Sequence, residues 1–239
     1  MTEQLQEIIE QSKRIVFFGG AGVSTESGIP DFRSAGGLFM AELGGEYRPE
    51  EIVSHSFFVR HTKEFYTYYK QHLIYPDAKP NSAHRALASL ESQGKLTAVV
   101  TQNIDGLHQD AGSKTVWELH GSVRRNDCTK CKRRYGLEIV LEADPIPYCP
   151  ECGGLVKPDV VLYEEGLDYA VMDGATDAIA QADTLIVGGT SLVVYPAAGL
   201  VQYFRGKHLV LINLTPTGAD RMATCIVREP IGEALSPFI

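Results

Sequence analysis

The chain of 239 residues lacks any long hydrophobic run. A helix that crosses a bilayer needs roughly 20 consecutive apolar residues, and no stretch approaches that length. The N-terminal segment is acidic and amphipathic, with Glu3, Glu7 and Glu10 around Leu5 and Ile8. A secretory signal instead begins with cations that precede an apolar stretch. We therefore expect a cytoplasmic protein that has no membrane partner.

The sequence is also poor in positive charge. Its 22 Lys and Arg residues are outnumbered by 30 Asp and Glu residues, which gives a formal net charge of -8. Binding to nucleic acid regardless of sequence requires a basic surface, so we expect no nucleic-acid partner. Basic partners such as lysine-rich protein tails are compatible with this charge, which is also ordinary for a cytosolic protein. Nothing in the pattern indicates an obligate assembly, so a monomer is expected.

Cysteines are few, and four of the five are regularly spaced as C-x2-C-x17-C-x2-C. The four are Cys128, Cys131, Cys149 and Cys152. Two C-x2-C turns, each with two thiolates, supply the four tetrahedral ligands that structural zinc prefers. Four thiolate ligands leave no open coordination position for catalysis. We therefore predict one structural Zn²⁺, with a redox pair of dithiols as the alternative. The fifth cysteine, Cys225, is expected to be a small buried residue without a chemical role.

Short apolar runs alternate with helical patterns along most of the chain. Continuous apolar runs are typical of parallel strands buried on both faces, and they predict strands at 14–18, 97–101, 116–119, 185–187 and 208–214. Helical spacing or a helix-opening proline predicts helices at 5–12, 80–90, 168–181 and 196–204. This alternation favours an α/β fold with a doubly wound parallel sheet.

A glycine-rich turn, Gly19-Gly20-Ala21-Gly22-Val23-Ser24, follows the first predicted strand. Glycines let the backbone approach a phosphate closely, and a helix is expected directly after the turn. The turn departs from the dinucleotide fingerprint G-x-G-x-x-G because Thr25 replaces the third glycine. No acidic residue ends a second strand about 20 residues later. Taken alone, the turn is either a nucleotide site or a tight connection.

Two stretches interrupt the alternation. Residues 33–75 are rich in Phe, Tyr and His and are predicted to form a helical insertion, and residues 123–156 carry the regularly spaced cysteines. We expect both insertions to pack on the large domain and to leave a cleft between. Polar residues cluster at 101–108 (TQNIDGLH) and at His120-Gly121, where we expect the chemistry to take place.

The segment 20–34, GAGVSTESGIPDFRS, closely resembles the signature of the sirtuins, the NAD-dependent protein lysine deacylases. Further blocks similar to those of the family follow in order: TQNIDGLH at 101–108, HG at 120–121, the two CxxC pairs, KPDVV at 157–161, GTSL at 189–192 and INL at 212–214. The matches extend from about residue 14 to residue 214. The chain therefore resembles a short sirtuin of the bacterial type.

The resemblance implies a fold of two parts. A Rossmann-like NAD-binding domain would comprise residues 1–32, 76–122 and 157–239. A small domain would combine a helical module, 33–75, with a zinc-ribbon module, 123–156. The implied cofactors are NAD, as a co-substrate, and one structural Zn²⁺. The implied partners are proteins or peptides that carry acetylated lysine.

The resemblance also implies roles for individual residues. NAD would be bound by Gly20, Ala21, Gly22, Thr25, Phe32, Arg33, Gln102, Asn103, Ile104, Asp105, His120, Gly189, Thr190, Ser191, Asn213 and Leu214. His120 would be the general base, and Asn103 would be a second catalytic residue. The substrate peptide would contact Val160, Val161, Tyr163 and Val194. The metal ligands would be Cys128, Cys131, Cys149 and Cys152.

In the implied reaction, the acyl carbonyl oxygen attacks C1′ of the nicotinamide ribose and nicotinamide leaves. A carbonyl oxygen is a poor nucleophile, so positioning of the reactants must supply much of the acceleration. Good orientation can lower the activation barrier by about 7–11 kcal/mol. Asp105 would bind the nicotinamide carboxamide, and His120 would take a proton from a ribose hydroxyl. A histidine with an unperturbed pKa near 6.5 suits that task. The products would be nicotinamide, free lysine and 2′-O-acyl-ADP-ribose.

Two departures from the family pattern affect substrate recognition. The family usually has a Phe-Gly-Glu-like triplet where this chain has Tyr163-Glu164-Glu165, so a glutamate replaces the glycine. The loop at 36–41 lacks the Tyr-x-x-Arg pair that binds acidic acyl groups, so uncharged acyl chains are expected. Two alternative functions are a mono-ADP-ribosyltransferase, which would use the same C1′ electrophile, and a non-enzymatic NAD-sensing module.

Overall fold

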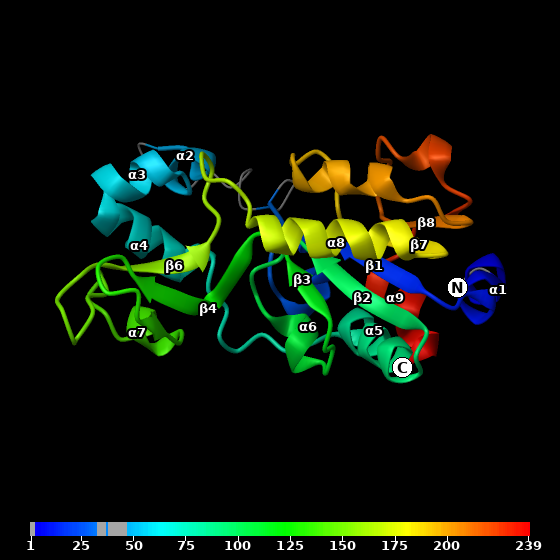
Figure 1. The fold of residues 1–239 in the computed structure, drawn as a ribbon, viewed down its shortest axis with the longest axis horizontal. Helices are drawn as coiled ribbons and strands as arrows, with labels where there is room; N and C mark the ends of the chain where they lie inside the picture. The colour runs from blue at the N-terminus through cyan, green and yellow to red at the C-terminus, as the bar shows by residue number, and fades with distance from the viewer. Residues whose placement is uncertain (1–2, 33–36, 38–46) are drawn as a thin grey trace.

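The computed structural model describes residues 3–32, 37 and 47–239. A six-stranded parallel sheet lies at one end of the molecule and a three-stranded antiparallel sheet lies at the other (Figure 1). The large sheet has the order β3-β2-β1-β7-β8-β9. Its strands are β1 (Ile15–Gly19), β2 (Leu96–Thr101), β3 (Val116–Glu118), β7 (Thr184–Gly188), β8 (His208–Ile212) and β9 (Cys225–Val227). The small sheet, in the order β5-β4-β6, comprises β4 (Gly121–Cys128), β5 (Arg134–Tyr135) and β6 (Val156–Val160).

Helices cover both faces of the large sheet, which confirms the predicted α/β class. The α-helices are α1 (Glu3–Gln11), α2 (Pro49–Ile52), α3 (His55–Arg60), α4 (Thr62–His72), α5 (Ser82–Ser92), α6 (Leu107–Asp110), α7 (Glu138–Leu141), α8 (Tyr169–Gln181) and α9 (Ile231–Leu235). Short 3-10 helices are η1 (Ala21–Val23), η2 (Thr25–Ser27), η3 (Ala197–Tyr203), η4 (Asp220–Met222) and η5 (Ser236–Phe238). Among the described residues, none of these helices combines the length and apolar character needed to cross a bilayer.

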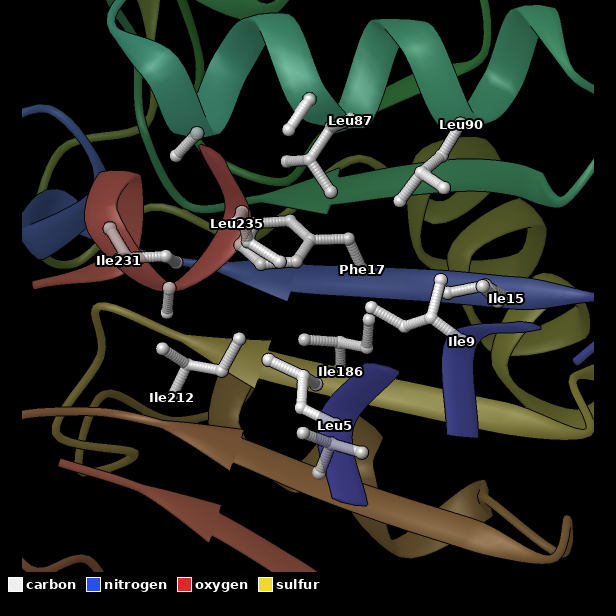
Figure 2. Packing of buried hydrophobic residues seen from close by; sticks show 14 of the residues in the cluster. Leu5, Ile9, Ile15, Phe17, Leu87, Leu90, Ile186, Ile212, Ile231 and Leu235 are labelled. Carbon is white, nitrogen blue, oxygen red and sulfur yellow. The ribbon is translucent and has the colours of Figure 1, made fainter. Parts of the chain in front are cut away.

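Alternation along β1 explains why the sheet is buried on both sides. Ile15 and Phe17 point into one cluster with α1, α5 and α9, as Figure 2 shows for Leu87 of α5 and Leu235 of α9. Val16 and Phe18 point into a second cluster with α8 and η3. Successive side chains of a strand face opposite sides, so a continuous apolar run is the sequence of a strand with a helical layer on each face.

The helical module packs on the small sheet. Phe58, Phe65 and Tyr66 from α3 and α4 form one buried cluster with Val123 of β4 and Val160 of β6. The predicted helical character of 33–75 is confirmed for the described part of that stretch. Because β4 and β6 run directly into the segments around His120 and Val161, this packing positions the side of the site that lies away from the large sheet.

The predicted helix after the glycine-rich turn is wrong. The chain forms the two 3-10 turns η1 and η2 instead. The Gly22 N–H donates to the Gly189 carbonyl at 2.8 Å, and Gly28, with φ of +83°, ends the second turn. Within the turns the backbone closes bonds between residues three apart, such as the Ser24 amide to the Ala21 carbonyl at 3.0 Å, in place of the four-residue spacing of an α-helix. The predicted helix at 196–204 is also a 3-10 helix, η3.

Candidate active site and zinc centre

A cavity of about 1070 Å³ opens at the C-terminal edge of the large sheet. It extends from the turns after β1, β2 and β7 to the helical module and the end of β6. Ligands of open parallel sheets bind beyond the carboxyl ends of the strands, where the strand order changes direction. Here that point lies between β1 and β7. The fold alone therefore marks this cavity as the candidate site.

Nearly all the site residues predicted from the sequence line this one cavity. They are Gly20, Ala21, Gly22, Thr25, Phe32, Gln102, Asn103, Ile104, Asp105, His120, Gly189, Thr190, Ser191, Asn213 and Leu214, with Val160, Val161, Tyr163 and Val194 on the peptide side. Arg33 lies outside the described residues, as do 38–41 of the loop predicted to set acyl preference. The structure thus brings together every described residue that was predicted to bind NAD or peptide.

The glycine-rich turn is pressed against the loop that follows β7. A methyl group on Gly22 would lie 2.8 Å from the Gly189 Cα and 2.9 Å from its carbonyl oxygen. Both atoms are backbone, so a side chain at position 22 would force the two turns apart. The close contact leaves Gly20, Ala21 and Thr190 on a shared wall of the cavity.

Ser24 links the two polar residues predicted for the nicotinamide pocket. Asn103 Nδ2 donates to Ser24 Oγ at 3.0 Å, and Ser24 Oγ donates to Asp105 Oδ2 at 2.7 Å. The Leu107 amide donates to Asp105 Oδ1 at 2.9 Å, which fixes the carboxylate at the start of α6. Ser24 is only 1% exposed. Ser24 lies inside the signature segment 20–34 but was not among the residues predicted for the site.

His120 is held in a single tautomer. Its Nδ1 lies 2.9 Å from the Gln102 carbonyl oxygen, and a carbonyl can only accept, so Nδ1 carries the proton. Nε2 therefore has the free lone pair that a general base needs. Burial lowers the pKa of His120, and the bond to Gln102 opposes that shift. The ring is thus neutral, oriented and at the cavity wall.

This geometry predicts the pH dependence of the activity. Because the pKa of His120 is lowered, the imidazole keeps its basic form to a pH below the ordinary value of about 6.5. We expect kcat/KM to be flat above pH 7 and to fall on the acid side with an apparent pKa below 6.5. A pH–rate profile measured with an acetylated peptide checks this. An acid limb centred above 7 would contradict a buried neutral base.

Gly121 explains how the chain places His120. Its φ is +73°, and a methyl group there would lie 1.8 Å from the Asp159 carbonyl oxygen. The Val161 amide also donates to the His120 carbonyl at 3.0 Å. The turn between β3 and β4 is therefore locked against the end of β6, so His120 and the residues at the end of β6 are held together.

The other end of the cavity is more open. Gln102 Nε2 donates to Thr190 Oγ1 at 3.1 Å, which joins the turn after β2 to that after β7. Asn213 Nδ2 donates to the Thr215 carbonyl at 2.8 Å, and Leu214 is 65% exposed. This end is also lined by four residues that were not predicted from the sequence: Thr215, Glu229, Pro230 and Ile231. They lie beyond the recognised blocks and carry no distinctive motif.

The four regularly spaced cysteines converge at the tip of the small sheet. Their sulfur atoms all lie within 4.8 Å of one another, with Cys128 and Cys152 at 3.5 Å and Cys131 and Cys149 at 3.7 Å. A tetrahedral zinc with ligands at 2.3 Å places its sulfurs about 3.8 Å apart, whereas a disulfide would need about 2.05 Å. The set therefore fits a structural zinc ion, as predicted, and does not fit a pair of disulfides.

Tyr135 adds a second contact to this centre. Its hydroxyl lies 2.9 Å from Cys149 Sγ, and this hydrogen bond is the main cause that lowers the pKa of Cys149 to about 6. A thiolate is the form that binds a metal. The four cysteines lie in and beside the small sheet, and none of them is among the residues that line the main cavity.

Comparisons with known proteins agree with the geometry. The model of the Sir2 family matches residues 20–196. An NAD-dependent protein deacetylase of Clostridium perfringens (strain 13 / Type A) is 62% identical over 237 residues, or 99% of this chain and 97% of the relative. A solved Sir2–p53 peptide–NAD⁺ complex has a TM-score of 0.85 at 38% identity and covers 99% of this chain and 97% of that chain. A solved structure of a Sir2 variant with deacetylated p53 peptide and 3′-O-acetyl-ADP-ribose has a TM-score of 0.88, also at 38% identity. The match covers 98% of this chain and 95% of that chain.

Proposed function

This chain belongs to the Sir2 family, and from that membership together with its site we infer that it is an NAD-dependent protein deacetylase. The single observation that carries this conclusion is the convergence of Asn103, Asp105 and His120 on one cavity of a chain 62% identical to a deacetylase. NAD is the co-substrate, and the four-cysteine cluster is a structural zinc site.

We propose that NAD lies across the turns that follow β1, β2, β7 and β8. Gly20 and Gly22 with the backbone of η1 would receive the phosphates, and Thr190, Ser191 and Asn213 would bind the adenosine half. Gln102 would hold the nicotinamide ribose. This placement is supported by the position of these residues, which lie on neighbouring turns and line one cavity. Residues 1–32, 76–122 and 157–239 would then form the NAD-binding domain.

The nicotinamide end would lie against Asn103, Ile104 and Asp105. The Asp105 carboxylate, already oriented by Ser24 and Leu107, still has lone pairs to accept from a carboxamide N–H. Phe32 at the cavity wall would exclude water from the ribose carbon. These contacts with the nicotinamide end of NAD would favour breaking of the bond between nicotinamide and the ribose when an acyl oxygen approaches C1′.

His120 would act on the ribose hydroxyl. With Nδ1–H bonded to the Gln102 carbonyl, only Nε2 can take the proton, and the resulting imidazolium would be stabilised by the same bond. The deprotonated hydroxyl would then attack the acyl-derived carbon, and the bond from that carbon to the lysine nitrogen would break as the amine takes up a proton. A water molecule would then add to the acyl carbon, which remains bonded to both ribose oxygens, so that free lysine and acyl-ADP-ribose are the products. General-base catalysis of this kind contributes about 10²–10⁴-fold.

Acetylated protein segments are the proposed partners. We propose that a peptide carrying acetyl-lysine enters between the end of β6 and the loop around Val194, in contact with Val160, Val161 and Tyr163. All four residues line the cavity that holds His120. The net charge of -8 favours basic, lysine-rich segments. We propose that the chain acts as a monomer.

The test is a mass-spectrometric balance on one reaction. Acetylated peptide and NAD are incubated with the protein, and peptide, nicotinamide and ADP-ribose products are quantified together. We expect one nicotinamide and one acetyl-ADP-ribose for each peptide that loses its acetyl group. A peptide or protein that gains ADP-ribose would instead indicate a mono-ADP-ribosyltransferase. Absence of nicotinamide release would indicate an NAD-sensing module.

A further inference from the structure

Glu164 has a backbone conformation that favours glycine. Its φ is +76°, and Lys132 and Leu192 are the only other non-glycine residues with positive φ in the part of the chain that the structure describes. A side chain in this region crowds the backbone, so an interaction elsewhere must stabilise it. The family pattern places glycine at this position. The glutamate therefore keeps the glycine conformation and adds a carboxylate.

That carboxylate is bound to the helical module. Glu164 Oε2 accepts from the Ser56 amide at 2.9 Å, and both carboxylate oxygens accept from the Ser56 hydroxyl at 2.7 and 2.6 Å. Ser56 lies in the first turn of α3, where backbone N–H groups have no partner within the helix. The bonds from Ser56 hold the pKa of Glu164 below its ordinary value, so the group is ionised at neutral pH.

The backbone beside Glu164 is attached to the same module. The Tyr163 amide donates to the Val53 carbonyl at 3.0 Å, and the His55 amide donates to the Tyr163 carbonyl at 3.0 Å. Glu165 adds a bond from the Leu162 amide at 2.9 Å and an ion pair with Lys157 at 3.1 Å. The segment 162–165 is thus joined to the helical module on one side and to β6 on the other.

Packing holds one end of this segment and leaves its middle exposed. Leu162 is buried in the apolar cluster that joins the helical module to the small sheet. Tyr163 and Glu164 are exposed, and they line both the main cavity and a second hollow of about 590 Å³ that is bounded by Arg60, His61 and α2. The hydrogen bonds to α3 therefore stabilise the two residues that packing covers least.

We propose that Glu164 is a positioning residue that ties the peptide-facing segment 161–165 to α3 and thereby sets the affinity for the acylated peptide. This rests on the proposed function, because it assigns that segment to the substrate. NAD lies on the opposite side of the cavity, against the large sheet, so its affinity is independent of Glu164. The carboxylate replaces the freedom of a glycine by a fixed contact between the peptide-facing segment and the helical module.

The test separates peptide affinity from NAD affinity. Glu164→Gly removes the carboxylate and suits the backbone, Glu164→Gln keeps an acceptor oxygen, and Ser56→Ala removes the hydroxyl partner. Glu64→Gln, an exposed carboxylate on α4, is the control. Dissociation constants are measured for a fluorescent peptide with one central acetyl-lysine and, separately, for NAD, and hydrogen exchange reports the Ser56 amide.

We expect Glu164→Gly to weaken peptide binding about 5–10-fold, Ser56→Ala about 2–3-fold, and Glu164→Gln and the control less than 2-fold, with NAD binding unchanged in all four. The double variant Glu164→Gly with Ser56→Ala should be no weaker than Glu164→Gly. Unchanged peptide affinity in Glu164→Gly, equal losses for NAD and peptide, or additive losses in the double variant would overturn the proposal. If Glu164→Gly does not fold, the comparison of Ser56→Ala with Glu164→Gln decides. Lack of turnover in the unaltered protein would contradict the deacetylase function instead.

Discussion

Replacement of His120 by alanine is expected to lower kcat for deacetylation by about 10²–10⁴-fold, the usual contribution of a positioned general base. The structure gives the reason: Nδ1 is committed to the Gln102 carbonyl, so Nε2 is the one ring nitrogen available to accept a proton. The measurement is single-turnover deacetylation of an acetylated peptide at saturating NAD. Nicotinamide release should fall less than acyl transfer, because the base acts after the acyl oxygen has bonded to the ribose.

A matched control separates chemistry from folding. His208→Ala alters a histidine at the N-terminal end of β8, the end of the large sheet opposite the cavity. We expect this variant to keep a rate within about 2-fold of the unaltered protein. Equal turnover in His120→Ala and His208→Ala would contradict the role assigned to His120. An unchanged melting temperature in His120→Ala would show that the variant loses activity because a catalytic group is missing and not because the protein is less stable.

Removal of zinc is the second change with a large expected effect. Structural zinc contributes on the order of 10–16 kcal/mol to the folding of small zinc-binding modules, which exceeds the stability of most whole domains. The apolar cluster around the cysteines contains little more than Val156, Tyr135 and Ile139. We expect Cys128→Ser, or a strong chelator, to unfold the segment between β4 and β6 and to abolish deacetylation.

The readouts for this prediction are zinc content, hydrogen exchange and activity. The unaltered protein should hold one zinc per chain, and Cys128→Ser should hold much less than one. Exchange should rise across residues 128–156, while the strands of the large sheet stay protected because their two cores do not include the zinc module. Cys225→Ala is the control, since this buried cysteine lies in β9. Full activity of a zinc-free protein would contradict a structural role.

Strands and metal ligands could be predicted because their signals are local. A run such as Ile15 to Phe18 is apolar at every position, which fits a strand buried on both faces and little else. The spacing of the four cysteines likewise indicates a tetrahedral zinc site without reference to the rest of the chain. The cavity residues were predictable as a set because the blocks that carry them resemble those of the sirtuins. Several of these blocks, at 20–25, 102–105, 189–191 and 213–214, follow parallel strands, whose ends share one edge of the sheet.

Features that depend on contacts between distant segments could not be predicted. The α-helix expected after the glycine-rich turn is replaced by two 3-10 turns, and the turn lies against Gly189, 167 positions along the chain, which no local pattern indicates. Ser24 gains its importance from Asn103 and Asp105, which only the fold brings near. Glu164 has a left-handed backbone and accepts from Ser56, 108 positions earlier, and no local pattern indicates either feature.

The most direct measurement is a crystal structure of the protein bound to NAD and an acetyl-lysine peptide, with a slow variant such as His120→Asn if turnover must be limited. We expect the dinucleotide to follow the turns after β1, β2, β7 and β8, with its nicotinamide ribose beside residue 120 and its C1′ facing the acetyl oxygen. A dinucleotide bound elsewhere, or a side chain at position 120 directed away from the ribose, would contradict the account.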